Sequence, residues 1–297
     1  MPNQDPHAKQ LLINYPHDTV ALFAPELLEL HGEVVAIEEV STEIFNPDPE
    51  GRSGFLDVAL RCTFADGSER IILLVEHWSS ARAINLRRAA RYLTELLCRH
   101  PSCQVLPVLL VTDARVTSAA EIDSRLNYTI ADQPVVDIHF RLHCIDEAWR
   151  QRVDYQRNVV AAVLWVVPRR GSAVDRCLQA MATICAMERA WDKGSLGALL
   201  AHMEQFAIIN AEQATQLRRR IQGDHTMPSM LVEIFKAEGK AEGKAEGEVH
   251  ALLTLVADGD LDRDKALARL SRWCAEGEIP QALHDRALAQ LQASAQD

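Results

Sequence analysis

The sequence predicts an α/β fold in which a mixed sheet is flanked by helices and followed by a helical C-terminal region. Apolar, strand-like stretches are concentrated before residue 145, and from about residue 150 onward the pattern is helical. An amphipathic helical pattern over residues 81–100 separates the second expected strand from the third. The four main strands are expected at Phe55–Phe64, Arg70–Trp78, Val105–Thr112 and Val135–Cys144.

The N-terminal part is expected to hold broken helices and one short strand. Residues 11–30 have a helical pattern with breaks near Pro16 and Pro25, because proline lacks the backbone donor that a helix interior requires. The alternating stretch Val34–Val40 predicts a short strand. Residues 46–54 are rich in proline and glycine and predict a loop.

The composition is that of a soluble globular protein. The chain has 297 residues, 48% hydrophobic and 25% charged, and this length favours two domains. The longest apolar run, Val159–Val167, is about half as long as a membrane span, and the N-terminus lacks the apolar core of a secretory signal. We therefore expect a cytoplasmic protein without a membrane partner.

The cysteines and the net charge argue against three features: a disulfide framework, a zinc site and the wholesale coating of nucleic acid. Seven scattered cysteines without zinc-type spacing predict neither a disulfide framework nor a zinc site. The formal charge of −11 argues against wholesale coating of nucleic acid, although an acidic protein can carry a locally basic face.

The clearest local pattern is a hairpin centred on Asp66-Gly67. This dipeptide is a strong two-residue turn signal, and the second strand, Arg70–Trp78, is so continuously apolar that both its faces should be covered. Counting outward from the turn places Asp57 opposite Glu76 on one face of the sheet. Directly opposed residues have Cβ atoms roughly 4.5–5.5 Å apart.

Two opposed carboxylates repel each other unless something compensates their charge. A shared divalent cation such as Mg²⁺ or Mn²⁺ would do so, because such hard cations prefer oxygen ligands. The alternatives are that one carboxylate is neutral or that both face water. A one-residue slip in the turn would abolish the pairing altogether.

The segment GFLDVALRCTFADGSERIILLVEHWSS, followed by an arginine-rich helix and by VLPVLLVTD, resembles the PD-(D/E)XK nuclease superfamily. Within it the chain is similar to the recombination-promoting nucleases, a family of YhgA-like, transposase-type proteins. The likeness covers roughly residues 12–115. The residues that stand in the family's motif positions are His17-Asp18, Asp57, Glu76-His77 and Arg88/Arg91-Tyr92.

The resemblance implies a restriction-endonuclease-like fold and Mg²⁺-dependent hydrolysis of DNA phosphodiesters. Asp57 and Glu76 would hold the Mg²⁺ or Mn²⁺ ion, which positions the phosphate and lowers the pKa of a water molecule. A third acid from the first helix often contributes in this superfamily, and Asp18 or Glu26 is the candidate here. For each of these two, a plain surface role on the helix is the alternative.

The chain departs from the family at Trp78, which occupies the place of the usual lysine or glutamine. An indole offers one N–H donor and no charge. No lysine occurs between Lys9 and Lys193, so a lysine elsewhere in the domain cannot replace it. Trp78 is expected either to pack in the core or to stack on a nucleotide base.

Arginines are the remaining cations near this position. Arg87, Arg88 and Arg91 are the candidate phosphate contacts and the possible substitutes for the missing lysine, and a solvated helix face is the alternative. His77 points away from Glu76 along the strand, so we expect a packed or hydrogen-bonded histidine instead of a metal ligand.

Four regions are expected. They are a nuclease-like domain at 10–150, a helical region at 151–235, a Lys/Glu/Gly repeat at 236–248 and a small helical tail at 249–297. In the repeat, like charges recur every four residues and glycines weaken a helix, which favours a flexible or weakly helical connector. A solvated helix packed on a partner is the alternative.

Two functions are compatible with these features. The first is a Mg²⁺-dependent DNA endonuclease of the recombination-promoting type. The second is a degenerate nuclease fold that binds DNA or protein without cleaving, in which Trp78 records the loss of catalysis. The oligomeric state is left open, with a homo-oligomer among the alternatives.

Overall fold

The structure is a computed structural model, and it divides the chain into two compact units, residues 1–227 and 228–297. It describes residues 5–40, 58–67, 70–167, 171–223, 244–245, 247–256, 258, 261–276, 278–279 and 281–293. In these ranges the fold is α/β, with a mixed sheet flanked by helices and helices throughout the C-terminal part, as predicted. The helices of 151–223 belong to the same unit as the sheet.

The central sheet has five strands in the order β1-β2-β3-β4-β7. The first three strands run antiparallel, whereas β4 and β7 run parallel to β3 and make the sheet mixed. The five strands are β1 (Val34–Glu39), β2 (Val58–Phe64), β3 (Arg70–Trp78), β4 (Gln104–Val111) and β7 (Arg141–Cys144).

The predicted hairpin is confirmed in its register. Strand β2 pairs with β3 from Thr63↔Arg70 to Val58↔Val75, which is the register that an Asp66-Gly67 turn imposes. Gly67 has a positive φ of 66°, a conformation that glycine adopts without steric cost. Strand β3 lies between β2 and β4 and is buried from Ile71 to Trp78, as its continuous apolarity predicted.

One face of the sheet is covered by α4 (Leu86–Arg99). Asn85 begins this helix by accepting a hydrogen bond from the Arg88 backbone N–H at 3.0 Å, and a short 3₁₀ turn, η1 (Ala81–Ala83), precedes it. The α4 side chains that pack into the apolar clusters on this face are Ala89, Ala90, Tyr92, Leu93 and Leu96.

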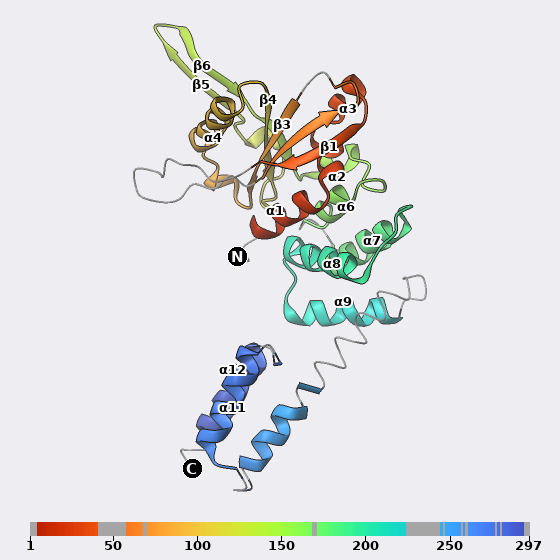
Figure 1. The fold of residues 1–297 in the computed structure, drawn as a ribbon, viewed down its shortest axis with the longest axis vertical. Helices are drawn as coiled ribbons and strands as arrows, with labels where there is room; N and C mark the ends of the chain where they lie inside the picture. Colours follow the sequence, from red (N-terminus) through yellow and green to blue (C-terminus); the bar gives the residue numbers. More distant parts are fainter. Residues whose placement is uncertain are drawn as a thin grey trace. The chain divides into compact units, whose positions relative to one another are not determined.

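The opposite face of the sheet is covered by N-terminal and later helices. Helix α1 (Asp5–Asn14) contacts β2, β3 and α8 (Lys193–Ala207), and Phe206 of α8 meets His77 of β3. Figure 1 shows α1 and α4 on different sides of the strands. The predicted breaks near Pro16 and Pro25 are confirmed, because α2 (Pro16–Phe23) and α3 (Pro25–His31) each begin at a proline.

The expected single strand over Val135–Cys144 is wrong. The segment divides at Phe140 into β6 (Gln133–His139) and β7 (Arg141–Cys144), which belong to different sheets. Strand β6 pairs with β5 (Arg125–Ile130), a strand that the sequence pattern did not reveal. Phe140 is buried beneath α4. The segment that reads as one apolar strand therefore contributes strands to two sheets.

The remaining helices of the first unit follow the sheet. A short 3₁₀ turn, η2 (Ala119–Glu121), lies between β4 and β5. After β7 come α5 (Glu147–Arg152), α6 (Val159–Leu164), α7 (Ala173–Ala186), α8 and α9 (Ala211–Gly223). Contacts of α6 with α2, α7 and α8 join these helices to the N-terminal part.

The second unit is helical. Residues 247–256, α11 (Arg263–Ala275) and α12 (Gln281–Ala293) share a core that includes Ala245 and Trp273. The described end of the Lys/Glu/Gly repeat is therefore helical and packed, with Lys244 3.7 Å from Glu248. Residues 236–243 of the repeat lie outside the described residues.

Candidate functional site beneath helix α4

Glu76 lies near the end of β3, the central strand of the sheet. Its side chain is 1% exposed and lies on the same face of β3 as Leu74 and Trp78, towards α4. A carboxylate is expensive to bury without compensating charge. Glu76 is thus the predicted site residue whose position most needs an explanation.

Arg88 supplies a positive charge beside this carboxylate. The Nη2 atom of Arg88 lies 3.6 Å from Oε2 of Glu76, which is an ion pair longer than a hydrogen bond. The Arg88 side chain remains 45% exposed, so its guanidinium joins the buried acid to the surface. Of the three predicted arginines, Arg88 is the one that the structure brings to Glu76.

Trp78 is buried in the cluster between β3 and α4. The guanidinium carbon of Arg88 lies 4.4 Å from the centre of the Trp78 ring and 5.8 Å from the centre of the Tyr92 ring. Arg88 therefore covers the indole in a cation–π contact, with Tyr92 further along the helix. The Trp78 Nε1 atom is buried and has no hydrogen-bond partner within the described ranges.

Asp57, the predicted partner of Glu76, lies outside the described residues. The observed ladder keeps the predicted register up to Val58↔Val75, the pair next to the predicted Asp57–Glu76 pair. Phe55, which the same count from the turn places opposite Trp78, also lies outside the described residues. In the part of the chain that the structure describes, no three His, Cys, Asp or Glu side chains form a group that could hold a metal ion.

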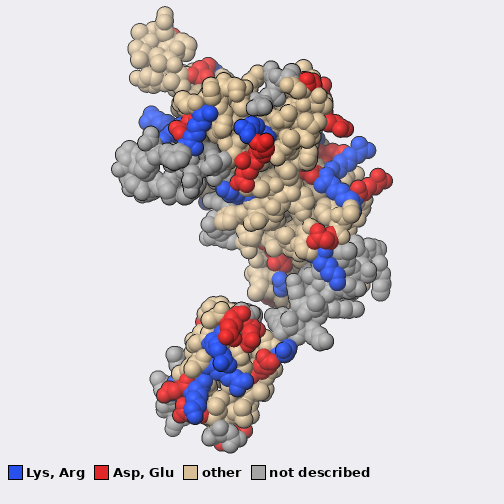
Figure 2. Space-filling model, in the orientation of Figure 1, with Lys and Arg blue, Asp and Glu red and all other residues tan. Residues whose placement is uncertain are grey.

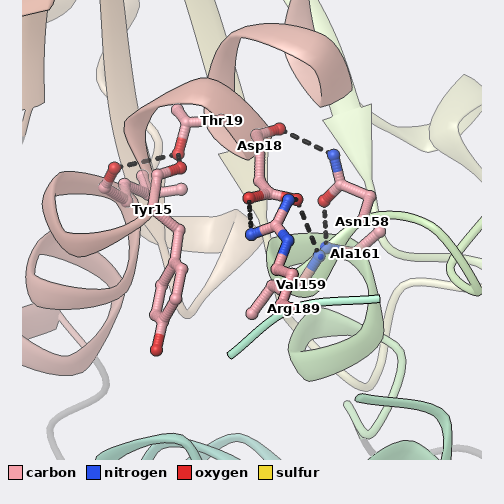
Figure 3. Close-up of polar contacts among 8 residues, drawn as sticks. Tyr15, Asp18, Thr19, Asn158, Val159, Ala161 and Arg189 are labelled. Carbon is pink, nitrogen blue, oxygen red and sulfur yellow. Dashed lines mark hydrogen bonds and ion pairs between the residues drawn. The ribbon is translucent and has the colours of Figure 1, made fainter. Parts of the chain in front are cut away.

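Asp18, a candidate third ligand, is held by other partners (Figure 3). Its carboxylate accepts hydrogen bonds from Nη1 and Nη2 of Arg189 at 2.7 and 3.0 Å and from the Val159 backbone N–H at 3.0 Å. Asn158 donates to the Asp18 carbonyl at 2.7 Å and caps α6 by accepting from Ala161 N–H at 2.8 Å. Asp18 therefore joins α2 to the start of α6.

Glu26, the other candidate from the N-terminal helices, also has a different partner. It forms an ion pair with Arg141 at the start of β7, and Arg141 in turn donates to the Phe23 carbonyl at 2.9 Å. The structure thus engages Asp18 and Glu26 in contacts between the N-terminal helices and later elements. Of the predicted metal ligands in the described ranges, Glu76 is the one beneath α4.

His77 is a hydrogen-bonded core histidine, as expected. Its Nε2 atom lies 2.8 Å from Thr112 Oγ1 at the end of β4, and its ring meets Phe206 edge-on. His77 alternates to the face of β3 opposite Glu76, so it does not reach the α4 side.

Asp113 is a buried acid that the sequence analysis missed. It follows β4, accepts hydrogen bonds from Ala81 N–H at 2.9 Å and from Arg115, and so fixes the segment between β3 and α4. The Arg115 guanidinium lowers the pKa of Asp113 to about 2. An aspartate directly after an apolar strand was the available signal.

The outer surface of α4 is basic. Arg87, Arg88 and Arg91 are all exposed, and Figure 2 shows Lys and Arg side chains gathered in this part of the first unit.

Among the described residues, none of the helices has the length and apolarity that a bilayer crossing requires. Comparison with known proteins adds no relative, because no family model, curated protein or solved structure matches the chain.

Proposed function

We propose that the first unit is a Mg²⁺-dependent DNA endonuclease of the recombination-promoting type whose centre is Glu76. The observation that carries the proposal is a 1% exposed carboxylate on the central strand, beside a half-exposed arginine on a basic helix. His17-Asp18, Glu76-His77 and Arg88/Arg91-Tyr92 lie on α2, β3 and α4, in the order along the chain that the family resemblance implies. The placements of Glu76 and Arg88 support the proposal, whereas Asp18 and His77 have partners away from this centre.

Glu76 is the described residue that would hold Mg²⁺, and Asp57, which the sequence predicts as its partner, would be the second carboxylate. Carboxylate oxygens are suitable ligands for this hard cation. When bound, Mg²⁺ orients a phosphate and makes a water molecule more acidic.

Arg88 would change its partner during DNA binding. Its guanidinium neutralises Glu76 when no cation is there, and its half-exposed position lets it turn to a phosphate when a metal ion takes over Glu76. A guanidinium can bind phosphate oxygens in a bidentate manner. Arg87 and Arg91 extend the same cationic surface for the DNA backbone.

A second function, DNA binding without cleavage, is favoured by one specific observation. Arg88 already compensates Glu76 and covers the buried Trp78, so the chain neutralises this acid with its own cation. In that case the basic face of α4 would bind DNA and no metal would be needed.

Plasmid cleavage tests the proposal and separates the two functions. Purified full-length protein should nick supercoiled DNA in Mg²⁺ or Mn²⁺, and Glu76→Gln should lower the rate by at least about 100-fold, more than the loss of an outer-shell group. Calorimetry should show Mn²⁺ binding that Glu76→Gln abolishes. Glu29→Gln, which changes an exposed glutamate on α3, is the matched control and should cleave like the wild type.

Two results would decide against the enzyme. Equal nicking by the wild type and Glu76→Gln would show that the activity does not come from this site. DNA retention in a mobility-shift assay, lost on Arg88→Ala but without nicking in either metal, would establish the binding function instead.

A further inference from the structure

Strands β5 and β6 form an arm that projects from the first unit (Figure 1). Ala131 and Asp132 connect them with positive φ angles of 49° and 65°, which is the conformation of a tight type I′ hairpin turn. In the described part of the chain the two strands pair only with each other. Each strand therefore has an outer edge, and that of β5 offers backbone donors and acceptors, whereas Pro134 removes one donor from β6.

The base of the arm is anchored to the body of the unit. Leu126 and Ile138 are half-buried against the cluster beneath α4. Arg125 donates to both carboxylate oxygens of Asp137 across the two strands, at 2.7 and 2.6 Å. These contacts fix the direction in which the arm leaves the unit.

The outer part of the arm is apolar and exposed. Tyr128, Ile130 and Val135 are 57%, 56% and 56% exposed, although a two-stranded ribbon of this size is marginally stable by itself in water. Exposed apolar side chains next to open strand edges are typical of a surface that pairs with another chain.

The charge of the arm selects among partners. From Leu126 to Val136 the one charged residue is Asp132, and at the base the charges of Arg125 and Asp137 offset each other. A tip with one negative charge and no Lys or Arg is unsuited to DNA phosphates. The whole chain carries −11, so two copies repel each other overall, and the arm, which has one charged residue between Leu126 and Val136, is a place where that repulsion is weak.

We propose that the arm is the surface through which two copies of this chain associate. Two copies of β5 related by a two-fold axis run antiparallel, so their open edges can pair into one continuous sheet. The same symmetry places the exposed apolar side chains of one arm against those of the other. The arm is thus a self-complementary surface independent of the site beneath α4.

Sedimentation equilibrium on the full chain at micromolar concentration tests this proposal. The wild type should have twice the 33.1 kDa mass of one chain. Ile130→Asp and Ile130→Lys should both reduce the mass to that of one chain, because either charge would be buried in a dimer. Leu30→Asp is the matched control, since it changes an exposed leucine on α3 and should remain dimeric.

The two Ile130 variants introduce opposite charges, so they also show whether the arm binds DNA instead of a second copy. If the arm contacts DNA, Ile130→Lys should strengthen and Ile130→Asp should weaken retention of a DNA duplex, with no change in mass. That pattern, a monomeric wild type, or a dimer that survives both Ile130 variants would each overturn the proposal. Because Ile130 is exposed, circular dichroism should show all variants folded.

Discussion

Asp18 and Glu76 are both buried carboxylates with an arginine partner, but their surroundings differ. Asp18 accepts two hydrogen bonds from Arg189 within 3.0 Å and a third from a backbone N–H. Glu76 has its arginine, Arg88, at 3.6 Å. Both guanidiniums are partly exposed, at 40% and 45%, so exposure does not explain the difference in geometry.

The difference agrees with the roles that we propose, in which Asp18 is structural and Glu76 takes part in the chemistry. Three short hydrogen bonds hold the Asp18 oxygens and tie α2 to α6 and Arg189. The contact between Arg88 and Glu76 is longer, and Arg88 is partly exposed, so this one contact can be exchanged for another cation. Burial alone therefore does not distinguish the two acids, whereas the geometry of their arginine contacts does.

Removing the Asp18 carboxylate should have the largest effect on stability. Asp18→Ala leaves the Val159 N–H and the Arg189 guanidinium without their acceptor, and we expect a loss of about 2–3 kcal/mol in the free energy of unfolding. Urea denaturation measures it. Glu29→Ala, at an exposed site, should change the value by less than about 0.5 kcal/mol. If Asp18→Ala changed the free energy of unfolding as little as Glu29→Ala does, Asp18 would not have the structural role described here.

Acidification should weaken the contacts on the face of the sheet opposite α4. His202 of α8 lies 3.1 Å from His7 of α1, and burial followed by the charge of His7 lowers the pKa of His202 to about 4. The folded state then binds fewer protons than the unfolded state, so stability is full above the ordinary histidine pKa of about 6.5 and falls as the pH drops towards 4. When the pH falls from 7 to 5, His202 should lower the free energy of unfolding by about 1–2 kcal/mol.

Thermal and urea unfolding of His202→Gln at the two pH values checks this expectation. The variant should lose less stability on acidification than the wild type does. His17→Gln, which changes an exposed histidine on α2, serves as the control. An unchanged pH dependence in His202→Gln would show that His202 does not titrate in this range. His143, whose pKa burial also lowers to about 4, would then account for the acid sensitivity.

Double-mutant cycles compare the two acid–arginine pairs directly. The coupling free energy between Glu76 and Arg88 should be the smallest of the effects predicted here. We expect a coupling free energy of about 2 kcal/mol for Asp18 with Arg189 and about 0.5–1 kcal/mol for Glu76 with Arg88. The variants are Asp18→Asn with Arg189→Gln and Glu76→Gln with Arg88→Gln. Equal couplings would mean that Glu76 is held as firmly as Asp18, and the distinction between the two sites would fail.

Much of the fold was predictable because the signals are local. The Asp66-Gly67 turn sets the β2–β3 register, and the prolines at 16 and 25 separate three helices. Continuous apolarity placed β3 inside the sheet. The strand β5 and the division of the segment at Phe140 were missed, because an exposed ribbon lacks the burial pattern that marks a strand in the core.

The sequence by itself determined the fold class, the hairpin register and the candidate residues, since turn chemistry and apolar periodicity act over a few residues. Only the tertiary structure decided what each candidate contacts. Asp18 meets Arg189 across 171 positions, and Arg88 reaches Glu76 because α4 packs over β3. Such contacts depend on how helices and strands pack in space, and local patterns carry no record of that packing.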